Sequence, residues 1–267
     1  MSPDEVLDAH LDTPVPQRVL VFDIETAPLH SYHFRVWKED IAPDQLQNRT
    51  WIICWSAKWA GQKTVHADTV TPEEALAEDD SRVVASLASL VREADVVVAH
   101  NLKGFDLKIL NTRLLDLRQP PLPPVTMLDT LDSVKRNFKL EYNRLDYLAR
   151  FLGLEPKHKM QMRDWILATK GDEKSLRKMT RYCKHDTQLL EDVLGIIRPY
   201  VKGLPRMVVG TRPFHKACPH CGSDDLNPTK DYRTKASDFP MFQCGNCQGF
   251  SRLRSSKQAT RLALHPL

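Results

Sequence analysis

The sequence predicts an α/β protein in which a mixed sheet is flanked by helices and is followed by a small metal-binding module. Strand-like segments come first along the chain, they then alternate with helical segments, and the end of this region is helical. That order is typical of a mixed sheet whose faces are covered. Beyond it, four of the six cysteines form two Cys-x-x-Cys pairs, a spacing that indicates a metal site.

The first three strands are expected to form a meander. Residues 18–23 are a short apolar run rich in β-branched side chains, and the last of them, Asp23, is an acid. Residues 51–59 form a second strand, in which tryptophans and other apolar residues alternate on one face and belong to the core. A hairpin turn at Gly61 then leads into a third strand at residues 63–67.

The elements that follow alternate between helices and strands. Apolar residues that recur every three or four positions predict helices, and short β-branched runs predict buried strands. On this basis we expect helical segments at residues 72–91, 105–117, 144–152 and 174–197, and strands at residues 95–99 and 125–128.

Length and charge divide the chain into three expected parts, namely a flexible segment at residues 1–16, a domain at residues 17–205 and a module at residues 206–267. A chain of 267 residues favours one large core with a smaller companion. The module carries ten Lys and Arg against four Asp and Glu, whereas the preceding residues carry 28 against 30. A basic module suits a polyanion such as nucleic acid, although a solvated surface explains the same composition.

The overall composition is that of an ordinary soluble globular protein, with 42% hydrophobic and 27% charged residues. The sequence contains no run of about 18 apolar residues, which a membrane-spanning helix needs. The N-terminus also lacks the basic-then-apolar order of a signal peptide. We therefore expect a cytoplasmic protein without a membrane partner.

The paired cysteines predict one structural Zn²⁺ ion. Cys218 and Cys221 form one pair, Cys244 and Cys247 form the other, and 22 residues separate them. This separation is slightly longer than usual, but a β-hairpin insertion can span it. The pattern resembles a zinc ribbon, with His220 as an alternative ligand inside the first pair. The two remaining cysteines are expected to be buried apolar side chains.

Acidic residues at three places can form a second metal site. Asp23 and Glu25 follow the first strand, Asp106 opens the helix after the fourth strand, and Asp186 lies on the last helix, one turn after Tyr182. Taken singly, each has an ordinary explanation, because acids at strand ends are usually solvated and an aspartate often caps a helix. Carboxylates gathered in one pocket would instead bind hard divalent cations.

In order and in local structure, these three segments resemble the motifs of the DEDD, or DnaQ-like, 3′–5′ exonucleases of the ribonuclease H-like fold, over roughly residues 18–200. The resemblance implies two Mg²⁺ or Mn²⁺ ions held by the four acids. Asp23 would bridge both ions, Glu25 and Asp186 would hold the ion that activates water, and Tyr182 would orient that water. The tyrosine indicates the DEDDy subtype, because the other subtype needs histidine at position 181, which is arginine here.

Further residues are expected to contact the substrate on weaker grounds. His100 and Asn101 can touch the terminal nucleotide or only end a strand, and Phe105 can stack on a base or belong to the core. Arg252 and Arg254 belong to a basic and aromatic stretch of the cysteine module that is compatible with nucleic-acid binding. The module can equally brace the catalytic domain or bind a protein.

The sequence therefore predicts a metal-dependent 3′–5′ exonuclease that acts on a single-stranded 3′ end and releases nucleoside 5′-monophosphates. DNA is favoured as the substrate, but an RNA substrate stays open because no reader of the 2′-hydroxyl can be recognised. The enzyme would work alone or on a replication or repair partner. Two other classes remain, an inert nucleic-acid-binding adaptor and a structure-selective endonuclease. The presence of all four acids and the tyrosine argues against an inert adaptor. The Tyr182–Asp186 pair argues against an endonuclease, because it resembles the motif of enzymes that cut from an end.

Overall fold

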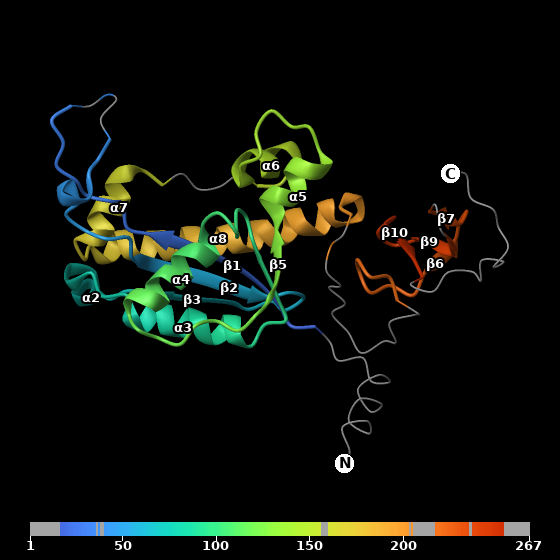
Figure 1. Cartoon of the computed structure of the whole chain (residues 1–267), viewed down its shortest axis with the longest axis horizontal. Coiled ribbons are helices and arrows are strands. Elements are labelled where there is room, and N and C mark those ends of the chain that lie inside the picture. The colour runs from blue at the N-terminus through green and yellow to red at the C-terminus, as the bar shows by residue number, and fades with distance from the viewer. Residues whose placement is uncertain are drawn as a thin grey trace, which may run out of the picture. The chain divides into compact units, whose positions relative to one another are not determined.

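The computed structural model describes residues 17–35, 37, 40–155, 160–202, 204, 217–234 and 237–253. The chain divides into two compact units (Figure 1). One unit is Arg18–Gly195, and the other contains the described residues from Ile196 onward.

The larger unit is built on a five-stranded mixed sheet with the strand order β3-β2-β1-β4-β5. Strands β1 to β3 form the predicted antiparallel meander, and β4 and β5 extend it in parallel with β1. The strands are β1 (Val19–Thr26), β2 (Ile52–Trp59), β3 (Val65–Thr69), β4 (Val96–Ala99) and β5 (Thr126–Asp129). The predicted mixed α/β sheet is thus confirmed.

One boundary matters for the site. Strand β1 does not end at Asp23, as the apolar run predicted, but continues to Thr26 because its backbone stays paired with β2. Asp23 lies opposite Ser56, and Glu25 lies opposite Cys54. Both acids therefore project from a strand in the middle of the sheet.

Helices cover both faces of the sheet, as the sequence predicted (Figure 1). On the first face, the indole Nε1 of Trp55 donates to the Val83 carbonyl of helix α3 at 2.9 Å. The next residue along the strand, Ser56, points to the opposite face and donates to the Cys183 carbonyl of helix α8 at 2.7 Å. Every residue of β2 is consequently buried.

Two helices were not predicted, namely α5 (Thr130–Asn137) and α7 (Met162–Thr169). Both have only eight residues, which is shorter than the window of about 11–18 residues over which an apolar repeat predicts a helix. The remaining helices are α2 (Pro72–Ala77), α3 (Ser81–Arg92), α4 (Asp106–Asp116), α6 (Leu145–Phe151) and α8 (Glu173–Ile197). Among the described residues, no helix combines the length and apolarity needed to cross a membrane.

The second unit contains short strands around the cysteines. Strands β10, β9 and β6 form a three-stranded antiparallel sheet, and β7 pairs with β8 in a small hairpin. This hairpin occupies part of the 22-residue separation between the cysteine pairs. The strands are β6 (Leu226–Pro228), β7 (Tyr232–Arg233), β8 (Asp238–Phe239), β9 (Met241–Cys244) and β10 (Phe250–Arg252).

Candidate active site and cysteine cluster

The structure brings acids from distant parts of the sequence to one place on the sheet. Asp23 and Glu25 come from β1, and Asp186 comes from α8, which crosses that face of the sheet. One carboxylate oxygen from each of the three lies within 4.8 Å of the others. Asp186 is buried, whereas Asp23 and Glu25 are half-buried.

Asp106, the fourth acid, is the first residue of α4 and lies beside Asp23. It is only 2% exposed, and its carboxylate accepts hydrogen bonds from its own N–H and from the N–H of Ile24 on β1. Burial, together with the negative charge of Asp23, raises the pKa of Asp106 well above its usual range. A buried carboxyl group beside another carboxylate is easier to ionise when a cation is present.

These donors fit divalent cations of the Mg²⁺ or Mn²⁺ type. All of them are carboxylate oxygens, which are hard ligands, and their crowding leaves negative charge that a bound cation would neutralise. Three of the four acids at which the sequence predicted metal, Asp23, Glu25 and Asp186, thus form a cluster that could hold a metal ion, and Asp106 lies beside Asp23 outside that group.

Tyr182 lies one helical turn before Asp186 on α8 and is half-buried. Its ring meets the ring of Trp165 on α7 edge to face, with the ring centroids 6.3 Å apart. Trp165 therefore limits the positions that the tyrosine ring can take. The sequence did not single out Trp165, because α7 itself was not predicted.

Cys183, the next residue on α8, packs under the acids. Its Sγ lies 3.4 Å from the carbonyl oxygen and 3.5 Å from Oδ2 of Asp23. Both Cys183 and Cys54 are completely buried, as predicted. Burial raises the pKa of the Cys183 thiol well above its ordinary value, so it stays a neutral thiol.

Asp129 is an acid that the sequence reasoning missed. It ends β5 and is buried, and its negative charge adds to the rise in the pKa of Asp106. Its carboxylate accepts hydrogen bonds from the backbone of Asn101 at 3.1 Å and Lys103 at 3.0 Å, and it caps α5. Asp129 thus connects β5 to the loop between β4 and α4, which leads to Asp106. An acid directly after a short apolar strand was the available signal, as it was for Asp23.

The three weaker candidates of the larger unit lie on that same loop. Both ring nitrogens of His100 are engaged within the protein, Nδ1 with Thr130 at 2.9 Å and Nε2 with the Asn143 carbonyl at 2.8 Å. Asn101 has a positive φ of 78°. Phe105 is half-buried and packs against the hydrophobic core. These placements favour structural roles for His100 and Phe105.

The four paired cysteines form a second cluster, with one sulfur atom from each within 4.8 Å of the others. The Sγ atoms of Cys218 and Cys247 are 3.7 Å apart, and those of Cys221 and Cys244 are 3.6 Å apart. A tetrahedral site with Zn–S bonds of about 2.3 Å has sulfur atoms about 3.8 Å apart, far beyond a disulfide bond. This four-cysteine cluster fits a zinc module.

The two cysteine pairs have the same backbone geometry. The N–H of Gly222 donates to the Cys218 carbonyl at 2.9 Å, and the N–H of Gln248 donates to the Cys244 carbonyl at 2.9 Å. Gly222 and Gln248, which each follow the second cysteine of a pair, also have a positive φ of 76° and 61°. Each pair therefore closes the same tight turn, which directs two thiols to one point.

The other charged and imidazole groups of this unit lie around the cluster. His220 is not one of the clustered ligands, and its Nε2 lies 3.1 Å from the Phe250 carbonyl. The Arg198 guanidinium interacts electrostatically with three of the cysteines, which offsets part of the charge of thiolates. Arg252 lies over the Phe239 ring at 4.1 Å, and Arg254 lies outside the described residues.

Comparison with known families gives a match over more than half of the chain. A sequence model described as the RNase H superfamily matches residues 44–197. The chain belongs to the RNase H superfamily. The matched residues include Asp106 and Asp186, whereas β1, which carries Asp23 and Glu25, precedes them.

Among solved structures, this RNase H superfamily member is similar to the family B DNA polymerase from the hyperthermophilic archaeon Pyrobaculum calidifontis. The TM-score is 0.53 at 19% sequence identity, and the similarity covers 70% of this chain and 25% of the polymerase chain. The likeness is therefore one of fold, over a quarter of a longer protein. A search of curated proteins found no match.

Proposed function

We propose that this RNase H superfamily member is a two-metal-ion 3′–5′ exonuclease of the DEDDy type. The observation that carries the proposal is the convergence of Asp23, Glu25 and Asp186 within 4.8 Å, with Asp106 beside Asp23. Two divalent ions bound there would activate a water molecule and stabilise the departing 3′ oxygen. Water then attacks the terminal phosphorus, the bond to the 3′ oxygen breaks, and a nucleoside 5′-monophosphate leaves.

Each acid has a place that suits its proposed role. Asp23 belongs to the three-carboxylate cluster and its charge also acts on Asp106, so we assign it the role of contacting both ions. Glu25 and Asp186 would hold the ion on the water side. Asp106 would hold the ion on the side of the leaving oxygen, where its buried carboxyl group needs a positive charge to stay ionised.

Tyr182 is proposed to orient the attacking water through its hydroxyl group. Asp186 and Tyr182 are one turn apart on α8, so a water held by Asp186 is within reach of the hydroxyl group. A phenol has an unperturbed pKa of about 10, which favours hydrogen bonding over proton abstraction. The edge-to-face contact with Trp165 would keep the ring in place.

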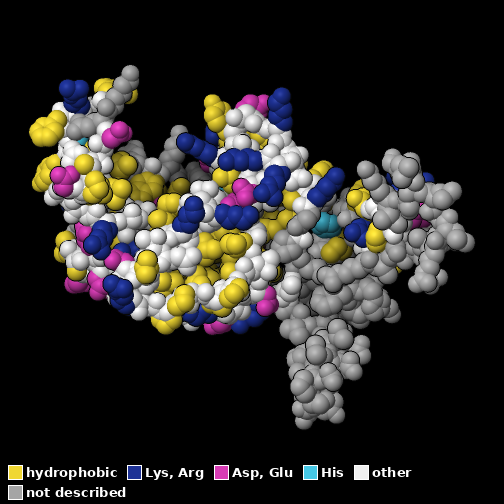
Figure 2. Space-filling view, in the orientation of Figure 1, with side chains coloured by type: hydrophobic (Ala, Val, Ile, Leu, Met, Phe, Trp, Pro, Cys, Tyr) yellow, Lys and Arg dark blue, Asp and Glu magenta, His cyan; other side chains and the backbone are white. Residues whose placement is uncertain are grey.

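The substrate is proposed to be nucleic acid, with DNA favoured over RNA. In Figure 2, Lys and Arg side chains gather over α5 and α6. These helices follow β5, the strand that ends at Asp129. The exposed cations of this stretch are Lys135, Arg136, Lys139, Arg144 and Arg150. Such groups can neutralise backbone phosphates as the strand approaches the acids. The fold similarity to a DNA polymerase is compatible with DNA.

The remaining parts of the proposal concern the organisation of the chain. We assign the catalytic domain to residues 17–205 and a zinc ribbon with its basic tail to residues 206–267, although the larger compact unit ends earlier, at Gly195. The matched turns of the two cysteine pairs support the zinc ribbon. The ribbon would aid substrate or partner binding, and a replication or repair protein is the expected kind of partner.

The test is a comparison of single strands labelled at the 5′ or the 3′ end, as DNA and as RNA, with Mg²⁺ or EDTA. We expect the 3′ label to leave at once as a mononucleotide and the 5′ label to give a ladder that shortens from the 3′ end. Asp186→Asn should reduce hydrolysis by at least about a hundredfold. Asp192→Asn, on an exposed position of the same helix, is the matched control and should retain activity.

The same experiment separates the competing functions. Release of internal fragments from both labels would indicate a structure-selective endonuclease. Absence of hydrolysis with Mg²⁺ and Mn²⁺, with wild type and Asp186→Asn alike, would favour an inert adaptor. Faster degradation of RNA than of DNA would reverse the substrate assignment.

A further inference from the structure

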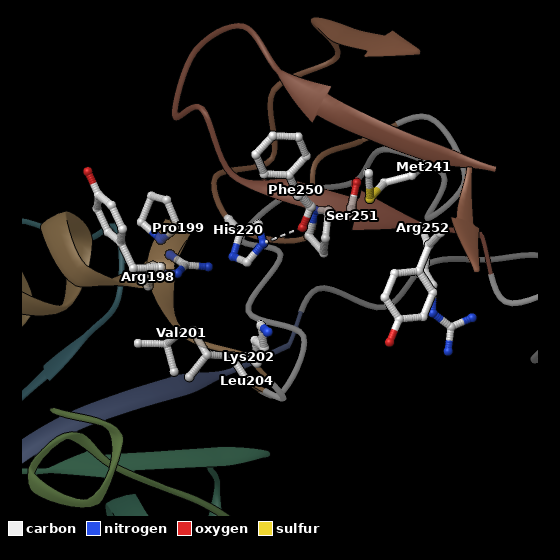
Figure 3. A pocket seen from close by; sticks show the side chains of 13 residues that line it. Arg198, Pro199, Val201, Lys202, Leu204, His220, Met241, Phe250, Ser251 and Arg252 are labelled. Carbon is white, nitrogen blue, oxygen red and sulfur yellow. Dashed lines mark hydrogen bonds between the residues drawn. The ribbon is translucent and has the colours of Figure 1, made fainter. Parts of the chain in front are cut away.

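The second unit contains a pocket of about 620 Å³ that the proposed catalytic function does not use (Figure 3). Residues 198–202 and Leu204, which follow α8, form one part of its lining, and the cysteine module forms the rest. The volume lies within the range of about 300–1,000 Å³ that is typical of ligand sites. The pocket therefore has room for part of a polymer or for a small molecule.

The charges that line this pocket all have one sign. Arg198, Lys202 and Arg252 are among the lining residues, and none of the described lining residues is Asp or Glu. Lys202 and Arg252 are exposed, whereas Arg198 is half-buried and also interacts electrostatically with the cysteine cluster. A pocket of this composition attracts an anion.

Exposed aromatic rings line the same pocket. Tyr200 is 68% exposed, Phe250 is 53% exposed and Tyr232 is 47% exposed. Large rings that remain this accessible next to cations favour a ligand with flat apolar faces and negative charges. Nucleic-acid bases stack on such rings in a sequence-tolerant way, while cations follow the phosphates.

The walls of the pocket are held in place by contacts within the unit. His220 Nε2 lies 3.1 Å from the Phe250 carbonyl, so the first cysteine turn is tied to the strand that carries Phe250 (Figure 3). Gly249 has no room for a side chain, because a Cβ atom there would lie 2.8 Å from the His220 ring. Arg252 lies 5.4 Å from the centre of the Tyr232 ring. These contacts hold the backbone of β10 against the first cysteine turn and place Arg252 beside the Tyr232 ring.

We infer that this pocket binds unpaired nucleotides of a single-stranded nucleic acid, with bases stacked on Phe250 and Tyr232 and phosphates contacted by Lys202 and Arg252. The inference rests on the proposed function in one respect, namely that the polymer bound by the protein is a nucleic acid. Bases inside a duplex are paired and stacked on both faces, so the pocket selects unpaired strands. A protein segment is the competing occupant, and it would not need cations and exposed rings together.

The test is the binding of a fluorescein-labelled (dT)15 strand to the full-length, zinc-loaded protein in Mg²⁺-free buffer, measured by fluorescence anisotropy. The Asp186→Asn background keeps the strand intact. Phe250→Ala and, separately, Tyr232→Ala should each raise the Kd about five- to twentyfold. Leu76→Ala, which removes an exposed apolar side chain from α2 of the larger unit, should leave the Kd within about twofold. Zinc content and circular dichroism establish that each variant is folded.

Salt dependence tests the phosphate contacts. The slope of log K against log salt concentration should become less negative by about 0.7 in Lys202→Gln, the value for one phosphate of a single strand. Lys170→Gln, at an exposed position of the larger unit, should leave the slope unchanged. A (dT)15 strand that carries 5-iodouracil should form photo-cross-links to the peptides of Phe250 or Tyr232.

The inference is overturned if both ring variants bind as the wild type does, or if all cross-links fall within residues 18–195. It is also overturned if a duplex of equal length binds as tightly as the single strand. Hydrolysis of the same strand by the wild-type protein with Mg²⁺ is measured in parallel. If hydrolysis is absent but the ring variants weaken binding, the exonuclease proposal fails and the pocket assignment stands. If hydrolysis proceeds while the ring variants bind normally, only the pocket assignment fails.

Discussion

Removing one acid from the cluster should stabilise the metal-free protein, although it destroys the proposed activity. Asp186 has a carboxylate oxygen within 4.8 Å of those of Asp23 and Glu25. At that distance each pair of charges repels by about 0.9 kcal/mol in bulk water and by about 3.5 kcal/mol at an effective dielectric constant of 20. Asp186→Asn removes two such repulsions and replaces the charge with an amide of similar shape.

Relaxation and screening reduce this sum, so we expect a gain of about 1–3 kcal/mol in the free energy of unfolding at pH 8 without Mg²⁺. For a domain of this size the midpoint temperature should rise by about 2–4 °C per kcal/mol. The assay is thermal unfolding of wild type, Asp186→Asn and the control Asp192→Asn. Saturating Mg²⁺ should stabilise the wild type and remove or reverse its difference from Asp186→Asn.

A lower stability of Asp186→Asn than of the wild type in metal-free buffer would contradict repulsion among the three acids. That result would mean that the carboxylate is held by favourable contacts within the protein. Equal stabilisation of the wild type and Asp186→Asn by Mg²⁺ would contradict binding of the ion at these acids, since the ion would then bind elsewhere.

Three further predictions concern the other groups. Tyr182→Phe should lower kcat by about ten- to a hundredfold and leave KM within about twofold, because only the orientation of the water is lost; an unchanged kcat would exclude that role. Asp106 should contribute a loss of stability to the metal-free protein as the pH rises above about 4, since its raised pKa means that its carboxyl group holds a proton in the folded state at pH values where it is ionised in the unfolded state. Asp106→Asn should flatten this dependence in thermal unfolding, and an equal slope in both proteins would contradict the assignment. Cys244→Ser should lower the zinc content from about one ion per chain to near zero and expose residues after 217 to proteolysis; retained zinc would show that the cysteines are not the ligands.

The elements that carry the site could be predicted because their patterns are local. The run that becomes β1, the alternation of β2 and the helix that opens at Asp106 are each visible within about ten residues. The spacing of Tyr182 and Asp186 also fixes their common side of α8 without knowledge of the fold. The convergence of these elements followed only from the resemblance of the motifs, because no local pattern brings β1 to α8.

What could not be predicted depends on tertiary contacts. Trp165 contacts Tyr182 across two helices, and α7 has no strong periodicity of its own. The two hydrogen bonds of His100 come from Thr130 and Asn143, which are far along the chain. Lys58 is buried on a core strand because it forms an ion pair with Glu191 of α8. From the sequence alone a lysine is expected to be exposed, because lysine is almost never buried without a partner.

The most direct test of the central claim is the position of Mn²⁺ in a crystal of the full-length protein, located by anomalous scattering. We expect two peaks about 4 Å apart, one contacted by Asp23, Glu25 and Asp186 and the other by Asp23 and Asp106. Asp186→Asn should lose the first of these peaks. Density for Mn²⁺ away from these acids, or none at saturating Mn²⁺ while the acids hydrogen-bond to one another, would contradict the account.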